Sequence, residues 1–399
     1  MSPLSAPSGA VALRLVHNAD AFVAVAAAWD ALFARAACTT ASLTSTAVHA
    51  FLAHRLGPGE QAVVVLAESG AELVGALPLV SHHRFGSTVL STLSDHESYG
   101  VDFLIDPSAP SSLRGDMLTY LLKGQRRVFR IRLEDVRAKE GTGAFLPRAG
   151  LSAHIDLRRR ASFVEVPATG DELVTALSSN FRKNLRKQEA RLRALSGVEV
   201  RFIGGGEAQA SHFADFVALE MSGWKGKNGT AIGCNPQLLA YYRALVHGWR
   251  GAGQLEWQFL LAEGRLIGAH LGVRMGNVLS LLKIAYDEAH AHCGPGNMLF
   301  LEMLRREATA GLSREVDCLT DMAWHRNWRM ASRDYVTVTL YPRRVVPWLF
   351  GYLPAVAADV LRRSPLARTT IRAIRRAFRR SESTTPSAGG PSGSMAETA

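Results

Sequence analysis

The sequence predicts an α/β (α+β) protein with two lobes, each built on a mixed, mostly antiparallel sheet flanked by helices. The chain has 399 residues, which is long for one domain and makes two the natural expectation. Three apolar runs, a glycine turn and a helical segment follow one another between residues 255 and 311. Residues 61–105 have a similar order of apolar runs and turns, so we expect an internal duplication without obvious residue identity.

The stretch between residues 255 and 311 gives the clearest pattern. Leu255–Leu261, Leu266–Val273 and Val278–Tyr286 are apolar runs separated by short segments with Gly or Asn, as in consecutive strands. His292–Asn297 forms a glycine turn, and the helical stripe after it stops at Gly311. A glycine turn that leads into a helix presents backbone N–H groups at the positive end of the helix dipole. We therefore expect this turn to bind a phosphate group.

Several short motifs follow one another in the second half of the chain. They are Glu220, Trp224-Lys225-Gly226, Gly229-Thr230-Ala231, Tyr241-Tyr242-Arg243, Leu266-Ile267-Gly268-Ala269, Tyr286-Asp287, Gly294-Pro295-Gly296, Gly311, Asp317 and Trp324–Trp328. In this order they resemble the acyl-CoA-binding half of the GNAT acyltransferases. They resemble more closely the CelD-like acetyltransferase domain, a relative of the Fem aminoacyl transferases. The resemblance covers the second half well and the first half loosely, and it implies two GNAT-like lobes packed together.

The expected division of the chain follows its composition. Residues 11–150 form the first lobe and residues 151–342 the acyltransferase lobe. Residues 343–380 form a basic tail with aromatic and amphipathic parts. Residues 1–10 and 381–399 are rich in small and polar residues, and we expect them to be disordered.

A basic helix is predicted over residues 171–196, at the start of the second lobe. It has an apolar stripe on one side, and six lysines and arginines between residues 182 and 193 occupy its other faces. This helix is either a surface for an anionic ligand or a solvated face between the lobes. The Fem-like alternative, in which the donor is a charged tRNA, draws its support from this helix.

The net charge of +11 is concentrated in the tail. Residues 343–380 carry ten arginines and one acid, which leaves residues 1–342 at +4. A nucleic-acid-binding body would carry its own basic face, so we expect no nucleic acid partner apart from tRNA in the alternative reading. The predicted amphipathic helix Leu366–Arg380 follows the aromatic segment Val345–Leu361. Residues 345–380 either contact a membrane surface peripherally or dock on the body with their arginines in water.

The cysteines and the hydropathy pattern bear on localisation. Cys38, Cys234, Cys293 and Cys318 are far apart, which argues against a zinc site or a disulfide framework and fits a reducing compartment. We expect no export signal, no spanning helix and no metal. The predicted location is the cytoplasm, with peripheral attachment at the inner face of the membrane.

Three residues are candidates for the general base. His270 interrupts an apolar run, Asp287 ends the following one, and a histidine near its normal pKa can accept a proton. Trp324–Trp328 resembles the Tyr-Lys-x-x-Trp segment of the family, and His325 takes the place of its lysine. A structural, hydrogen-bonded His270 is the alternative.

The donor and the acceptor have their own candidate residues. The acyl-CoA candidates are Cys293, Gly294, Gly296, Asn297 and Lys283. The acceptor candidates are Trp224, Lys225, Tyr286, Asp321, Trp324 and Trp328. Two positions depart from the GNAT phosphate-binding signature, because Ala291 stands where an amide or basic residue is usual and Pro295 lacks a backbone donor. Cys293 is either a nucleophile or a small buried thiol.

The predicted function is transfer of an acetyl or other acyl group from acyl-CoA to an amine or hydroxyl. The resemblance implies a small-molecule, glycan-linked or lipid-linked acceptor from cell-envelope or exopolysaccharide material. Two alternatives remain. One is a Fem-like transferase that takes an aminoacyl group from tRNA, and the other is a degenerate GNAT pair that binds without catalysis.

Overall fold

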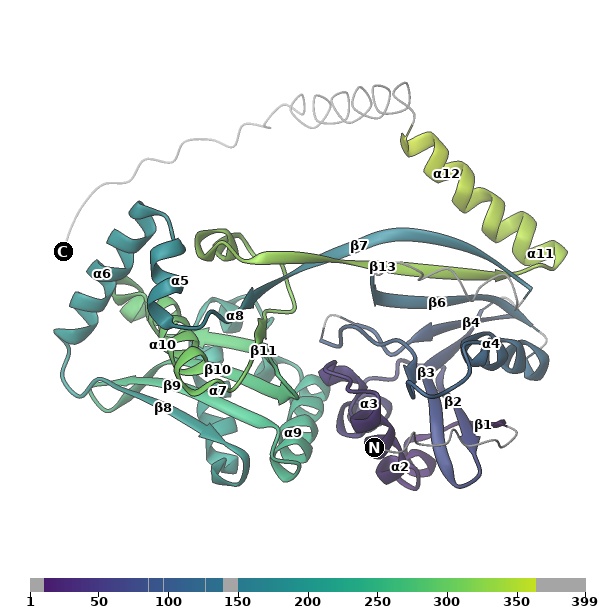
Figure 1. The fold of residues 1–399 in the computed structure, drawn as a ribbon, viewed down its shortest axis with the longest axis horizontal. Helices are drawn as coiled ribbons and strands as arrows, with labels where there is room; N and C mark the ends of the chain where they lie inside the picture. Colours follow the sequence, from purple (N-terminus) through teal and green to yellow (C-terminus); the bar gives the residue numbers. More distant parts are fainter. Residues whose placement is uncertain (1–10, 85, 96, 126, 139–149, 364–399) are drawn as a thin grey trace, which may run out of the picture.

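The computed structural model describes residues 11–363, apart from residues 85, 96, 126 and 139–149. In this described part, thirteen strands form one mostly antiparallel sheet that runs through two halves (Figure 1). The predicted fold class, a mixed α/β protein with helices flanking the sheet, is confirmed. The termini that we expected to be disordered and the predicted helix Leu366–Arg380 lie outside the described residues.

The first half contains six strands and four α-helices. The strands are β1 (Val11–Val16), β2 (Glu60–Ser69), β3 (Glu72–Arg84), β4 (Ser87–Thr92), β5 (Leu104–Ile105) and β6 (Val128–Arg137). The helices are α1 (Ala19–Val23), α2 (Ala26–Arg35), α3 (Ser45–His54) and α4 (Leu113–Gly124). The first three helices lie between β1 and β2 in the sequence, and α4 precedes β6.

The second half repeats this arrangement. Its strands are β8 (Glu199–Gly204), β9 (Leu255–Ala262), β10 (Arg265–Met275), β11 (Val278–Tyr286) and β12 (Glu315–Asp317). Its helices are α5 (Gly170–Ala176), α6 (Ser179–Arg193), α7 (Ala210–Ser222), α8 (Trp224–Lys227), α9 (Pro236–Gly251) and α10 (Pro295–Ala310). The predicted strand, strand, strand, turn, helix order from Leu255 onward is therefore present, although the helix begins at Pro295, inside the predicted turn His292–Asn297.

The strand pairing supports the expected duplication. In the first half, β1 to β4 pair successively in antiparallel fashion and β4 pairs with β6 in parallel. In the second half, β8 to β11 pair successively in antiparallel fashion and β11 pairs with β12 in parallel. Among the described residues, each half also has three α-helices between its first two strands and one α-helix before its parallel strand.

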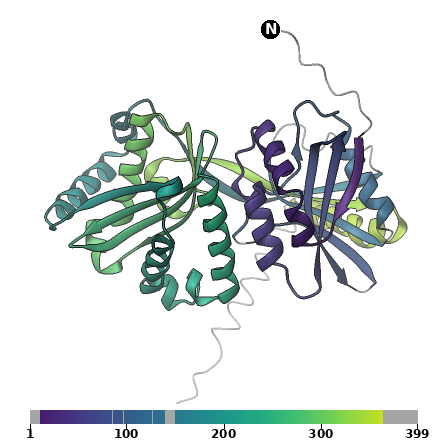
Figure 2. The same cartoon turned by 90° about the horizontal axis from the view of Figure 1, so that it is seen from below.

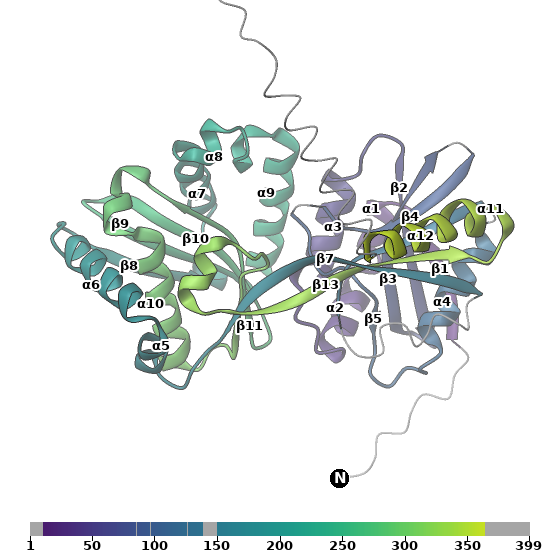
Figure 3. The ribbon, with the colours of Figure 1, turned by 90° about the horizontal axis from the view of Figure 1, so that it is seen from above.

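Two long strands join the halves. β7 (Leu151–Glu165) and β13 (Ala331–Pro342) pair with each other, while β13 also pairs with β6 and β7 with β12. They cross from one half to the other when the molecule is seen from above (Figure 3). Because both strands belong to both halves, the lobe boundary after residue 150 stays a prediction.

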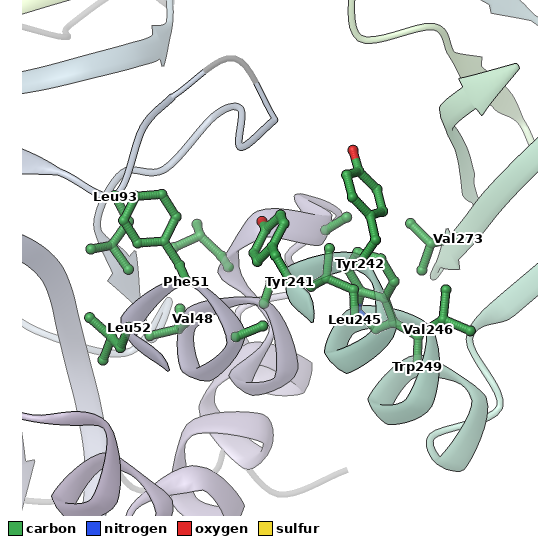
Figure 4. Close-up of a cluster of buried hydrophobic side chains, with 14 of the residues drawn as sticks. Val48, Phe51, Leu52, Leu93, Tyr241, Tyr242, Leu245, Val246, Trp249 and Val273 are labelled. Carbon is green, nitrogen blue, oxygen red and sulfur yellow. The ribbon is translucent and has the colours of Figure 1, made fainter. Parts of the chain in front are cut away.

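A shared hydrophobic core also joins the halves, and α3 and α9 face each other within it (Figures 2 and 4). Val48 and Phe51 of α3 belong to the same buried cluster as Leu245 of α9. A side chain on Gly248 would overlap the side chain of Thr46, so glycine allows the two helices to approach closely.

The predicted basic helix over residues 171–196 is wrong as a single element. The structure divides it into α5 and α6, with Leu177 and Ser178 in extended conformation between them. The Ser178 hydroxyl oxygen accepts a hydrogen bond from the Phe181 N–H at 3.2 Å and caps the start of α6. A serine cap satisfies a backbone donor that has no partner inside the helix, which stabilises a new helix start at this position.

The described part of the chain ends in a helical run that follows β13. It comprises α11 (Val345–Pro347), a π-helical turn (Trp348–Tyr352) and α12 (Leu353–Arg363). By length and composition alone, Val345–Arg362 is long and apolar enough to cross a membrane. The sequence had led us to expect no spanning helix. One such helix is weak evidence for a membrane span.

Candidate active site

The candidate site begins where β11 and β12 separate. Only Val278–Ser280 of β11 pair with β12, in parallel with Glu315–Asp317. β11 then continues to Tyr286, whereas the chain after β12 follows β7, with the Cys318 N–H donating to the Ser162 carbonyl at 3.0 Å. In the described part of the chain, no strand pairs with this side of the last residues of β11.

We call the space between the diverging ends of β11 and β12 the gap. A β-bulge lies in β11 at the start of this gap. Leu271 of β10 is opposite Lys283 and Gly272 is opposite Leu281, so Leu282 is the extra residue on β11. A bulge changes the direction of a strand and increases its local twist, which separates β11 from its neighbour.

Backbone groups of β11 point into the gap. The Asp287 N–H donates to the Ile267 carbonyl on β10 at 2.9 Å. Because neighbouring residues of a strand direct their N–H and C=O groups to opposite sides, those of Ile284 and Tyr286 point away from β10 and toward the gap. The Ile284 N–H can therefore donate to an oxygen atom placed between β11 and β12.

Lys225 of α8 also reaches this gap. Its Nζ donates to the Ile284 carbonyl at 2.9 Å and to Glu220 Oε1 at 2.8 Å. The Glu220 side chain is 1 % exposed, and its other oxygen accepts from the Ile232 N–H at 2.8 Å. The neighbouring Trp224 is 49 % exposed, so this predicted acceptor residue presents a large apolar surface next to Lys225.

The glycine turn lies between the end of β11 and the start of α10. Gly294 has a left-handed backbone with φ of 59° and is the residue before the first turn of α10. Pro295 occupies the first turn, where the missing N–H costs no internal hydrogen bond. The space beside Gly296 is open, since the nearest atom to an added Cβ would be Tyr286 Cδ1 at 3.9 Å. A 16-residue helix thus directs its first N–H groups toward an open surface.

Helix α6 packs against this turn and brings polar groups to it. The Gln188 side chain contacts Gly294 and accepts from Asn297 Nδ2 at 3.1 Å. Arg191 Nη1 donates to the His292 carbonyl at 3.0 Å. Helix α6 therefore brings one amide and one basic side chain to this turn, which the sequence spacing could not reveal.

A cavity of about 440 Å³ lies between the two halves, next to the start of the gap. Ser280 and Leu282 of β11 and Asp317 of β12 line it from the second half. Tyr99 and Arg137 line it from the first half. The cavity and the gap therefore meet at the same short segment of β11.

Asp317 is the acidic group that the cavity shares with the gap. It is 6 % exposed, and burial raises the pKa of its carboxyl group, although Arg333 and the Leu319 N–H oppose this increase. A carboxylate with a raised pKa is a suitable proton acceptor. Asp317 belongs to the motifs of the resemblance, but it was not among the predicted bases. Its place after Val316, at the end of a short strand, was the available signal.

Arg159 of β7 lies between two aromatic rings near the cavity. Its guanidinium carbon is 4.3 Å from the ring centre of Tyr335 and 4.5 Å from that of Tyr99. Both tyrosines line the cavity, and burial, with a smaller effect of Glu97, raises the pKa of Tyr99 to about 12. Arg159 Nη2 is buried without a hydrogen-bond partner among the described residues.

Of the three predicted bases, His270 is the most enclosed. It is 2 % exposed, its Nδ1 lies 2.9 Å from Gln258 Oε1, and its ring contacts Phe300 of α10. Burial lowers the pKa of His270 to about 3, so this histidine is neutral at ordinary pH. It faces α10, whereas its neighbours Ala269 and Leu271 belong to the core on the other face of the sheet.

The other two predicted bases have structural partners. Asp287 accepts from the Ala289 N–H at 2.9 Å and lies 2.8 Å from His290 Nδ1. Burial alone would raise the pKa of Asp287, but these hydrogen bonds outweigh it and the pKa is lowered. His325 Nδ1 accepts from the Met322 N–H at 3.0 Å, and burial lowers the pKa of His325. Among the described residues, those that line the cavity do not include His270, Asp287 or His325.

Three more predicted residues lie in or against a hydrophobic core, and a fourth, Asp321, is exposed. Trp328 is 3 % exposed and packs on Phe300, and Trp324 contacts the same ring. Cys293 is fully buried, and burial raises the pKa of its thiol. Asp321 is exposed and accepts from the Ser162 hydroxyl at 2.9 Å.

Residues 179–326 match the family model described as "Acetyltransferase (GNAT) domain", so this part of the chain contains a GNAT-type acetyltransferase domain. No curated protein sequence matches the chain.

Three solved structures have a similar fold. FemX is 12 % identical over 73 % of this chain and 90 % of its own, with a TM-score of 0.51. A conserved protein of unknown function from Bacteroides thetaiotaomicron is 12 % identical over 79 % and 97 %, with a TM-score of 0.52. The C-terminal domain of a putative lysylphosphatidylglycerol synthetase from Agrobacterium fabrum is 10 % identical over 80 % and 92 %, with a TM-score of 0.50. At these identities the likeness concerns the fold alone.

Proposed function

We propose that this protein transfers an acetyl or other acyl group from acyl-CoA to an amine or hydroxyl group bound between the two halves. The separation of β11 from β12 after Ser280 and Asp317 is the observation that carries this proposal. The bulge, the glycine turn and the inter-half cavity all adjoin this gap. A GNAT-type domain over residues 179–326 supports acyl transfer in general.

In this account the donor extends from the glycine turn into the gap. The first N–H groups of α10 would hold its diphosphate, because a helix N-terminus favours negative charge. Arg191 and the other exposed cations of α6 would add charge next to the same turn. The thioester carbonyl would then accept from the Ile284 N–H, which stabilises the negative charge that develops on its oxygen.

The acceptor would enter from the cavity, on the side of Asp317. Its amine or hydroxyl attacks the thioester carbonyl carbon, the carbon–sulfur bond breaks, and CoA leaves as a thiolate. The Asp317 carboxylate accepts the proton that the acceptor loses. The proton then passes to the departing thiolate or to water.

The acceptor class rests on the CelD-like resemblance together with the cavity. A volume of about 440 Å³ is in the range of small-molecule sites, and the cavity carries both tyrosine rings and arginine side chains. Aromatic rings and charged donors suit a sugar unit that bears an acidic or phosphate group. We propose an acceptor of this kind from cell-envelope or exopolysaccharide material, and the cytoplasmic location stays a prediction.

The Asp317→Asn variant tests the role of the proposed base. It should bind acetyl-CoA with the wild-type dissociation constant but lose about a hundredfold or more in transfer rate, as is usual when a general base is removed. Asp215→Asn is the matched control, because Asp215 is an exposed acid of α7 that does not line the cavity. Equal loss of rate in both variants would remove Asp317 from the mechanism.

The Fem-like alternative uses the same fold with a different donor. Lys183, Arg186 and Lys187 of α6 are exposed, and they would suit a tRNA phosphate backbone. Competition between charged tRNA and acetyl-CoA distinguishes the two donors. Binding of charged tRNA that weakens steeply with salt, without any binding of acyl-CoA, would favour the alternative. Binding of neither donor would favour the non-catalytic module.

A further inference from the structure

The helical run from α11 to α12 exposes a row of large apolar side chains. They are Val345, Val346, Trp348, Leu349, Phe350, Leu353, Val360 and Leu361. Phe350 and Val345 are both 72 % exposed, and 6 % of the stretch Val345–Arg362 is buried. Contiguous exposed apolar surface of this kind marks a contact with another molecule or with a lipid phase.

The opposite side of this run is fixed to the body of the protein. The Tyr352 ring lies 6.0 Å from that of Tyr341 on β13, and Gly351 lies against the Tyr341 ring with no room for a side chain. Arg362 Nη2 of α12 lies 3.5 Å from Asp156 Oδ1 on β7. These contacts hold one side of the run against β7 and β13 and leave the apolar side chains named above exposed.

A basic cavity lies at the start of the same run. Its volume is about 560 Å³, and it lies between the C-terminal end of α4 and the end of β13. Lys123, Arg343 and Arg344 contribute cationic side chains to its lining, and Leu122 and Pro342 contribute apolar atoms. Three cations next to an exposed apolar surface suit a phosphate group that is attached to an apolar chain.

The sequence after α12 adds charge of the same sign. Residues 364–380 contain six arginines and no acidic residue. This stretch starts directly after the last residue of α12, so its charge is attached to the end of the apolar surface. Basic residues next to an apolar surface are attracted to bilayers that contain anionic lipids, whereas a basic partner would be repelled.

We propose that Val345–Arg363 docks on a bilayer of anionic phospholipids, with its apolar side in the interface and a lipid phosphate in the Lys123–Arg343–Arg344 cavity. The helix lies on the membrane and does not cross it, because its other side is held on β7 by Arg362 and on β13 by Tyr352. This proposal does not depend on acyl transfer. It would also place the inter-half cavity at a fixed orientation relative to a lipid surface.

Sedimentation of the full-length protein with vesicles tests the proposal. The protein should pellet with vesicles of phosphatidylcholine and phosphatidylglycerol and remain in solution with phosphatidylcholine alone. The double variant Val360→Ser/Leu361→Ser and the single variant Phe350→Ser should each bind at least tenfold more weakly. Val23→Ser is the matched control, because Val23 is 57 % exposed on α1 and should leave binding unchanged.

A second set of variants tests the cavity. Lys123→Gln and Arg343→Gln should weaken binding to the anionic vesicles several-fold and reduce its dependence on salt. Equal binding to neutral and anionic vesicles, or wild-type binding by both apolar variants, would overturn the proposal. Resistance of the bound protein to carbonate extraction would show a spanning helix instead. Loss of a dimer in the Phe350→Ser variant without any vesicle binding would assign the surface to a second copy of the chain.

Discussion

The ammonium group of Lys283 lies 2.8 Å from the carboxylate of Glu97 and joins β11 to a loop of the first half. The Tyr242 hydroxyl donates to the same carboxylate at 2.6 Å. Burial raises the pKa of Tyr242 well above its ordinary value, so the hydroxyl stays protonated and remains a donor. Lys283 directly follows the bulge residue Leu282. This interaction therefore fixes the position of β11 at the proposed gap relative to the first half.

Removal of the Glu97 carboxylate should destabilise the contact between the halves. The side chains of Glu97 and Lys283 are both 15 % exposed, so Glu97→Ala would leave a largely buried cation without its partner. We expect the free energy of unfolding to fall by about 2 kcal/mol, the usual contribution of hydrogen bonds to charged groups. Urea unfolding measures this change. Glu199→Gln, which breaks an exposed ion pair, should leave the unfolding midpoint unchanged, and a similar midpoint shift in both variants would contradict the prediction.

The close approach of α3 and α9 should be sensitive to one methyl group. Gly248→Ala places a Cβ against Thr46 and should lower stability by about 1–2 kcal/mol, since overpacking outweighs the gain in helix propensity. Gly251→Ala in the same helix meets no atom within 4 Å and should be neutral or stabilising. Adding Thr46→Ala to Gly248→Ala should restore most of the loss. Equal melting temperatures for the two glycine variants would show that the helices have room to separate.

His270 should make stability depend on pH. Its pKa is about 3 in the folded protein and 6.5 in the reference state, so the unfolded chain binds a proton below pH 6.5 that the folded protein excludes. The contribution of His270 to the free energy of unfolding is therefore fully present above pH 6.5 and is lost as the pH falls toward 3. Between pH 7 and pH 5 the loss should be about 2 kcal/mol. Urea unfolding of wild type and His270→Gln at both values should show a smaller difference in the variant, and parallel losses would contradict the assignment.

Lys225 should be needed for the shape of the gap. Lys225→Met leaves the buried Glu220 without its ion-pair partner and the Ile284 carbonyl without a side-chain donor. We expect a loss of about 3 kcal/mol in stability, because breaking a buried pair leaves an uncompensated charge. The double variant Lys225→Met/Glu220→Gln should recover stability but not the transfer rate. Recovery of both properties would limit Lys225 to a structural role.

The sequence predicted the local features of this site and missed those that arise from distant contacts. The three strands from Leu255 to Tyr286 and the turn at Gly294 were readable because hydrophobic runs and glycines act locally. The separation of β11 from β12 depends on where β7 pairs, more than a hundred residues away in the chain. The packing of Gln188 on Gly294 likewise joins two distant helices.

His270 and Asp317 show why the choice of base differed between sequence and structure. His270 interrupts an apolar strand and Asp317 ends the short strand β12, and the sequence favoured the histidine for its ordinary pKa. The structure places His270 toward α10, inside a core, and Asp317 toward the cavity. Neither direction is fixed by strand periodicity alone, because the helices that cover each face are known only from the fold.

The break at Ser178 had a local signal, since serine is a preferred N-cap residue.

The most direct test of the central claim is calorimetric titration of acetyl-CoA into wild-type protein and the Gly296→Ala variant. The space beside Gly296 is open, so the variant should keep the wild-type melting temperature. Its methyl group would stand where the donor diphosphate approaches α10, and we expect the dissociation constant to rise at least tenfold, or about 1.4 kcal/mol. Wild-type protein that is folded and gives no heat with any acyl-CoA would contradict the account, as would equal affinity in the two proteins.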